Sequence, residues 1–170
     1  MNVMTQALLQ ELEMEIPATR KTLERIPENF DWSPHPKSMT VGRLAQHVAE
    51  IPDWAVKAIS LDELDLAPPG GAGYQPPIPT NKAQVVEAFD KNIAAAKAAL
   101  AGASDEHMMK PWSLKMGGKT ILTMPRIAVV RNFVMNHNVH HRAQLGVYLR
   151  LNNISVPSVY GPSADEGSMG

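Results

Sequence analysis

Apolar residues recur at intervals of three and four along four long segments of the chain, and this spacing predicts amphipathic helices. The segments are approximately residues 5–26, 41–58, 81–100 and 124–151. Helices of this length, joined by short irregular stretches, are typical of a four-helix bundle. The sequence therefore predicts an all-α fold in which each helix turns its apolar stripe towards the other three.

Residues that start and interrupt helices refine this prediction. Thr40 is a suitable N-cap for the second helix, and Asn81 with Gln84 three positions later resembles a capping box for the third. Pro17 and Pro52 lie inside the first and second segments, where proline removes a backbone hydrogen bond and kinks a helix. The alternative at Pro52 is that the second helix simply ends there.

The stretch before the fourth helix differs from the other connections. "KPWSLKMGGKTILTM" contains two short runs of strand-forming residues around Gly117 and Gly118, which predicts a small β-hairpin between the third and fourth helices. No internal repeat and no boundary divides the chain. We therefore expect a single domain over residues 1–170.

Composition excludes several classes of function. The net charge is −1, so the chain has no electrostatic basis for binding nucleic acid. Cysteine is absent, which excludes disulfides, thiolate metal ligands and a cysteine nucleophile. The N-terminus lacks the pattern of a signal peptide, and no apolar run is long enough for a membrane span. We expect a soluble cytoplasmic protein that binds neither nucleic acid nor membranes.

Three of the six histidines fall within five positions of the fourth helix. His137 and His141 are four residues apart, so they are neighbours on one helical face, and that face is the apolar stripe. His47 has the corresponding inward position on the second helix. Imidazoles on facing helices can bind one metal ion, whereas His140 is rotated off the stripe and is predicted to support the site or face solvent. The alternative is three hydrogen-bonded core histidines.

Four motifs resemble the DinB/YfiT-like superfamily of four-helix-bundle metalloproteins. They are "HNVHHRAQL" from His137, "VGRLAQHVAEIPDW" around His47, "DWSPHPKSMT", and "SVPSVYGPSADE" near the C-terminus. The resemblance covers nearly the whole chain; Ala143 departs from it, because glycine is commoner there. It implies a metal site formed by His47, His137 and His141. It also implies a homodimer, and for some members transfer or isomerisation reactions that use small thiols such as bacillithiol or mycothiol.

A site of three neutral imidazoles keeps an open coordination position, as catalytic metal sites do. We expect a divalent transition metal, zinc or nickel in the first place, with iron or manganese as alternatives. The predicted function is that of a metal-dependent, thiol-dependent transferase acting on a small molecule. The alternatives are a metal-dependent hydrolase and a metal-binding stress-response protein without turnover.

Hydrolysis would need a general base or an orienting partner near the ion. Glu50, three residues after His47, is the candidate for this role, and an ordinary solvated carboxylate is the alternative. Asp53 and Gln144 are weaker candidates. Arg142 is rotated about 100° from His141 around the helix, which predicts an ion pair at the surface.

Overall fold

The computed structural model describes residues 2–71, 73 and 79–167. Its helices are α1 (Val3–Glu24), α2 (Val41–Glu50), α3 (Asp53–Ser60), α4 (Lys82–Gly102), α5 (Asp105–Met108), α6 (Arg126–Val129), the π-helix η1 (Val130–Asn136) and α7 (His137–Leu151). Its strands are β1 (Glu63–Asp65), β2 (Pro111–Met116) and β3 (Lys119–Pro125).

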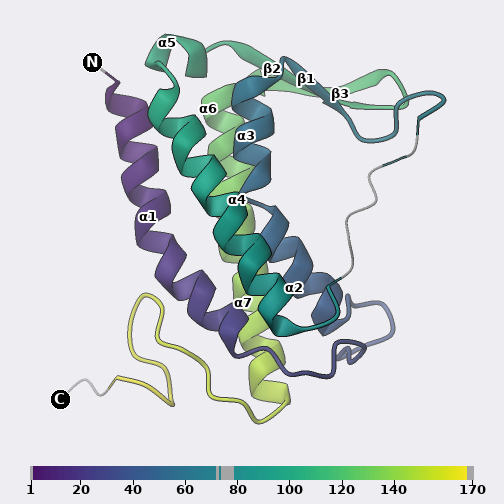
Figure 1. Ribbon diagram of the computed structural model, residues 1–170, viewed down its shortest axis with the longest axis vertical. Coiled ribbons are helices and arrows are strands. Elements are labelled where there is room, and N and C mark those ends of the chain that lie inside the picture. Colours follow the sequence, from purple (N-terminus) through teal and green to yellow (C-terminus); the bar gives the residue numbers. More distant parts are fainter. Residues whose placement is uncertain (1, 72, 74–78, 168–170) are drawn as a thin grey trace.

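The long helices lie side by side as a bundle, with a small sheet at one end (Figure 1). α4 packs against α1, α2 and α3, while α7 packs against α1 and α2. The helices α6, η1 and α7 follow one another without a break, so residues 126–151 form the fourth long rod of the bundle. The predicted fold class is therefore confirmed.

The predicted helix starts are present. The hydroxyl of Thr40 accepts from the backbone N–H of Arg43 at 3.2 Å, and the Asn81 side chain accepts from the N–H of Gln84 at 3.0 Å. The Gln84 side chain reaches back one residue further than a standard capping box, because its oxygen accepts from the N–H of Thr80 at 2.8 Å. The fourth rod begins directly after Pro125.

Proline affects the first two predicted helices differently. α1 continues through Pro17, whereas the second predicted helix is a pair of helices separated at Ile51 and Pro52. Both of these residues keep right-handed helical dihedral angles, with φ of −50° and −61°. The chain therefore passes from α2 into α3 with helical dihedral angles but with a change of direction (Figure 1), and the missing N–H of Pro52 accounts for the interruption.

The predicted hairpin is present as antiparallel β2 and β3, with Gly117 and Gly118 at positive φ in the turn. Both glycines adopt the backbone that a tight hairpin turn requires. The sheet has a third strand that the sequence did not predict, since β1 pairs in parallel with β2. The carboxylate of Asp65 in β1 accepts from the N–H groups of both turn glycines, at 3.1 and 2.7 Å, and so fastens the turn to the neighbouring strand.

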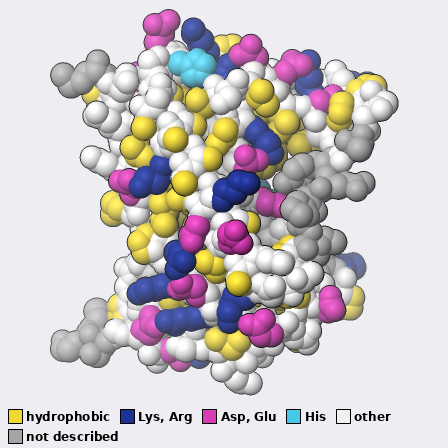
Figure 2. Space-filling view, viewed as in Figure 1, with side chains coloured by type: hydrophobic (Ala, Val, Ile, Leu, Met, Phe, Trp, Pro, Cys, Tyr) yellow, Lys and Arg dark blue, Asp and Glu magenta, His cyan; other side chains and the backbone are white. Residues whose placement is uncertain are grey.

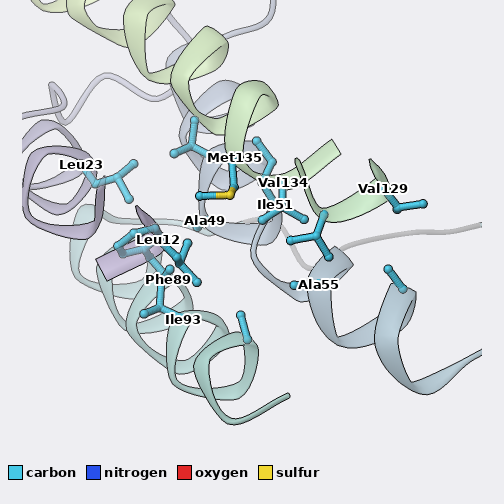
Figure 3. Packing of buried hydrophobic residues seen from close by; sticks show 14 of the residues in the cluster. Leu12, Leu23, Ala49, Ile51, Ala55, Phe89, Ile93, Val129, Val134 and Met135 are labelled. Atoms are coloured by element: carbon cyan, nitrogen blue, oxygen red, sulfur yellow. The ribbon is translucent and has the colours of Figure 1, made fainter. Parts of the chain in front are cut away.

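The core lies between the four rods. Figure 3 shows Leu12 of α1 against Phe89 and Ile93 of α4, with Ala49 of α2 and Met135 of η1 close by. None of the helices in the described part of the chain is long and apolar enough to cross a membrane. On the face shown in Figure 2, acidic and basic side chains are interspersed, in keeping with the near-zero net charge.

Candidate metal centre

Two neighbouring rods of the bundle bring three histidines together. His47 lies in the second half of α2, while His137 and His141 lie one turn apart at the start of α7, which packs against α2. His47 and His137 are half-buried, and His141 is 8% exposed. The three histidines predicted from the sequence therefore lie together, and two of their rings are still partly exposed to solvent.

The ring nitrogens face one another at distances that suit a shared ion. The Nε2 atom of His137 is 2.8 Å from Nε2 of His141 and 3.2 Å from Nε2 of His47. A tetrahedral ion with bonds of 2.0–2.1 Å would hold its ligand nitrogens about 3.3 Å apart. The three rings approach from two helices, so they occupy one side of such an ion. This group could hold a metal ion and leave its remaining coordination positions to other ligands.

Burial keeps the imidazoles neutral. It is the main cause that lowers the pKa of His47 to about 4, and the charges of His141, His137 and Arg43 lower it further. Burial also lowers the pKa of His137 and His141, and nearby positive groups add to the effect. Near pH 7 all three rings therefore have an unprotonated nitrogen, which is the form that coordinates metals.

Hydrogen bonds on the far side of two rings fix their orientation. Nδ1 of His141 is 2.7 Å from the side-chain oxygen of Gln144, and the His137 ring makes a hydrogen bond with the backbone of Phe133. Metal-ligating histidines commonly donate their second N–H to such acceptors. Gln144, a weaker candidate in the sequence, is thus in contact with one ring of the group. Its position three residues after His141 was the available signal.

Glu50 and Asp53 line a cavity on another side of α2. This cavity has a volume of about 430 Å³, and its opposite wall is α4. Glu50 accepts a hydrogen bond of 2.8 Å from Gln46, and Asp53 forms an ion pair of 2.6 Å with Lys57. The rings of the three histidines meet between α2 and α7, and the orienting role of Glu50 stays a prediction.

The prediction that Arg142 forms a surface ion pair is wrong. Its side chain is buried, and it donates to the Glu15 carboxylate at 2.6 Å, to Thr19 at 3.1 Å and to the Tyr160 hydroxyl at 2.7 Å. The 100° rotation from His141 points Arg142 towards α1 rather than towards solvent. Tyr160 also donates to Glu15 at 2.9 Å, so the C-terminal segment is anchored to the bundle.

Aromatic pairs lie along the rods on either side of the histidines. Trp54 of α3 stacks on Phe133 with ring centroids 6.3 Å apart, and Phe133 is one turn before His137. Trp32 meets Tyr148 edge-on at 5.5 Å, and Tyr148 is two turns after His141. Tyr148 lies on α7 itself, whereas Trp54 and Phe133 lie on α3 and η1, the helices that continue α2 and α7.

The remaining histidines lie outside the group. His140 is exposed and its Nε2 is 3.2 Å from the Gln144 side-chain nitrogen, which agrees with a supporting position. His35 is exposed in the loop before α2. His107 in α5 lies 2.7 Å from the backbone oxygen of Ile59.

The chain is similar to known proteins in sequence and in fold. The chain is 26% identical over 159 residues to the uncharacterized protein YrdA of Bacillus subtilis strain 168, covering 93% of this chain and 89% of that protein. A crystal structure of a DinB-like protein from Bacillus cereus ATCC 10987 has a TM-score of 0.70 at 22% identity, covering 91% of this chain and 97% of the other.

A second crystal structure, of the DinB-like protein YjoA from Bacillus subtilis, has a TM-score of 0.66 at 14% identity, with 90% and 96% of the two chains covered. These structural likenesses establish the fold. The sequence model of the DinB family matches residues 1–168, nearly the entire chain. The chain therefore belongs to the DinB family.

Proposed function

We propose that the protein binds one divalent transition metal ion through Nε2 of His47, His137 and His141, and uses it in chemistry on a small molecule. The convergence of these nitrogens at 2.8 and 3.2 Å carries the proposal. Zinc and nickel are the first ions to test, with iron and manganese next, because imidazole ligands alone do not select among them.

Proton positions favour an ion over three core histidines. A neutral imidazole has one N–H and one lone pair. The N–H of His141 is used at Nδ1 by Gln144, and that of His137 by the backbone of Phe133, so both Nε2 atoms carry lone pairs. Two lone pairs facing each other at 2.8 Å repel unless a positive charge lies between them. A shared cation supplies that charge, and the lowered pKa of each ring disfavours an extra proton.

For the chemistry, we propose transfer of a small thiol to an electrophile. A divalent ion, when bound, favours the deprotonated form of a thiol ligand. In the balanced reaction the sulfur forms a bond to the electrophilic carbon, the leaving group departs with its electron pair, and the thiol proton passes to solvent. The chain has no cysteine, so the sulfur has to come from a cosubstrate. The positive charge of Arg43, near enough to lower the pKa of two of the rings, would also favour an anionic sulfur.

Metal binding is tested by elemental analysis of protein purified without an affinity tag. We expect about one transition metal ion per chain in the wild type and a loss in His47→Ala and His141→Ala. His35→Ala is the matched control, because His35 is an exposed histidine outside the group. Addition of zinc at about 100 times its Kd should raise the free energy of unfolding by about 2.7 kcal/mol in wild type and control only. Wild-type protein that contains no metal and takes up neither zinc nor nickel would contradict the proposal.

Thiol transfer is tested separately, on protein loaded with the ion so identified. We expect consumption of thiol and electrophile in equal amounts, with loss of turnover in His141→Ala. A fully loaded protein that is inactive towards low-molecular-weight thiols with alkylating and epoxide electrophiles would refute the transferase function and leave metal binding as the supported role.

A further inference from the structure

Gln144 is connected to the histidine group from the solvent side of α7. Its side chain is exposed, yet its oxygen lies 2.7 Å from Nδ1 of His141, the nitrogen that faces away from the other two rings. The amide oxygen can only accept, so His141 donates its single N–H to Gln144. This contact determines which nitrogen of His141 is left with a lone pair, because the hydrogen bond made by one ring nitrogen fixes the state of the other.

The amide of Gln144 is itself held in one orientation. Its nitrogen lies 3.2 Å from Nε2 of His140 on the preceding turn. Since the amide nitrogen can only donate, Nε2 of His140 accepts, and the amide oxygen remains directed at His141. A rotation of the amide by 180° would set an NH₂ group against Nδ1 of His141 and require the opposite tautomer. That tautomer would carry its proton at Nε2, where His137 is 2.8 Å away.

We propose that Gln144 is the positioning residue of the metal centre, and that it acts by holding His141 as the Nδ1–H tautomer with the Nε2 lone pair directed at the ion. His140 contributes by keeping the Gln144 amide in the required orientation. This inference rests on the proposed function, because it assigns the orientation of one of the three ligands. Two quantities test it: the tautomer of His141 in the metal-free protein, and the metal affinity of Gln144 variants.

The tautomer is read from the imidazole ¹⁵N chemical shifts of the apo protein at pH 7.5. Wild type should show His141 protonated at Nδ1, and Gln144→Glu should retain this state because a carboxylate is also an acceptor. Gln144→Leu should convert His141 to the Nε2–H form or to a mixture. A purely structural contribution of Gln144 would not move these shifts. Gln10→Leu is the matched control, since Gln10 is an exposed glutamine on α1.

Metal affinity is measured by competition with a chromophoric zinc chelator. Removing an acceptor behind a metal-ligating histidine typically weakens binding about 10- to 100-fold, and we expect this loss for Gln144→Leu. Gln144→Glu should bind at least as tightly as wild type. His140→Ala should weaken zinc binding less, about threefold to tenfold, because His141 keeps the Gln144 oxygen as its acceptor while the Gln144 amide loses the partner that fixes its orientation. Urea unfolding of each variant shows that the fold is retained.

Each outcome decides the question. The inference is overturned if His141 keeps its tautomer in Gln144→Leu, or if the zinc affinity of Gln144→Leu is within twofold of wild type. The proposed function stands in that case, provided that the wild type binds the metal. If the wild type binds no zinc, nickel, iron or manganese, the proposed function fails, and the inference fails with it. The inference is supported if the variants show both the predicted His141 tautomers and the predicted order of zinc affinities.

Discussion

Replacing Arg142 with methionine should destabilise the protein strongly, although Arg142 lies next to a candidate ligand rather than in the hydrophobic core. Its side chain is 4% exposed and pairs with Glu15, which is 19% exposed, and it also donates to Thr19 and Tyr160. Methionine fills much of the same space but donates no hydrogen bond. The substitution therefore leaves the Glu15 carboxylate between α1 and α7 without its cation.

The magnitude follows from the loss of one partner of a buried pair, which costs about 3–5 kcal/mol. Because Glu15 retains some exposure and the Tyr160 hydroxyl, we expect the lower end, about 3 kcal/mol. For a chain of this size, that loss lowers Tm by about 6–12 °C. Urea unfolding followed by far-ultraviolet circular dichroism measures the free energy, and the experiment is done on metal-free protein.

The chain offers a matched control on the same two rods. Arg131 pairs with Glu11 of α1, but both side chains are more than 40% exposed. Arg131→Met should therefore cost less than about 1 kcal/mol. In a double-mutant cycle, Glu15→Gln combined with Arg142→Met should reveal a coupling of about 1.5–3 kcal/mol. If Arg142→Met loses no more stability than Arg131→Met, the buried network does not stabilise the bundle and the reasoning is wrong.

Three further outcomes are expected. Hydrogen bonds from arginine side chains lower the pKa of Asp165 and Glu166, so the stabilisation that these carboxylates provide is present above pH ~4 and is lost as the pH falls through their folded-state pKa. Proteolysis of residues 155–167 should therefore accelerate as the pH is lowered through this range. An unchanged rate of proteolysis down to pH ~3 would contradict this. Arg126→Met should lower the free energy of unfolding in urea by about 2–3 kcal/mol, because two backbone carbonyls at the end of α3 lose their hydrogen-bond donor. A loss below about 1 kcal/mol would contradict this reasoning. Gly118→Ala should lower the free energy of unfolding by about 1–2 kcal/mol in thermal unfolding, because φ of Gly118 is +77°. The control Gly102→Ala should not destabilise the protein. Equal melting temperatures of the two variants would refute the strain argument.

Local sequence patterns predicted the long helices and the histidine group well, because both depend on spacing along a single helix. The N-caps at Thr40 and Asn81 are contacts within four residues, and the His137 and His141 pair needs only one turn of α7. His47 was predicted from its place on an apolar stripe, which its own helix determines.

The features that were missed depend on distant partners or on hydrogen-bond pattern. β1 is three residues long, and it is a strand only because β2, about 50 residues later, pairs with it. The burial of Arg142 depends on α1 and the C-terminal segment lying against α7, which periodicity within α7 does not reveal. Gln144 was only a weak candidate, since its spacing from His141 places it near that ring but does not show which ring nitrogen it contacts.

The π-helix η1 ends at Asn136, directly before the first histidine of the pair. In a π-helix each N–H bonds five residues back instead of four, so one turn takes up about one residue more than an α-helical turn. One residue corresponds to about 100° around an α-helix. Deleting a single residue between Val130 and Asn136 would thus remove this extra residue and turn η1 into an α-helix, with His137 and His141 still directed at His47, whereas deleting a second residue would rotate them away by about 100°. The π turn therefore gives the chain one residue of tolerance between the hairpin and the paired histidines, and a larger change in length would separate the three rings.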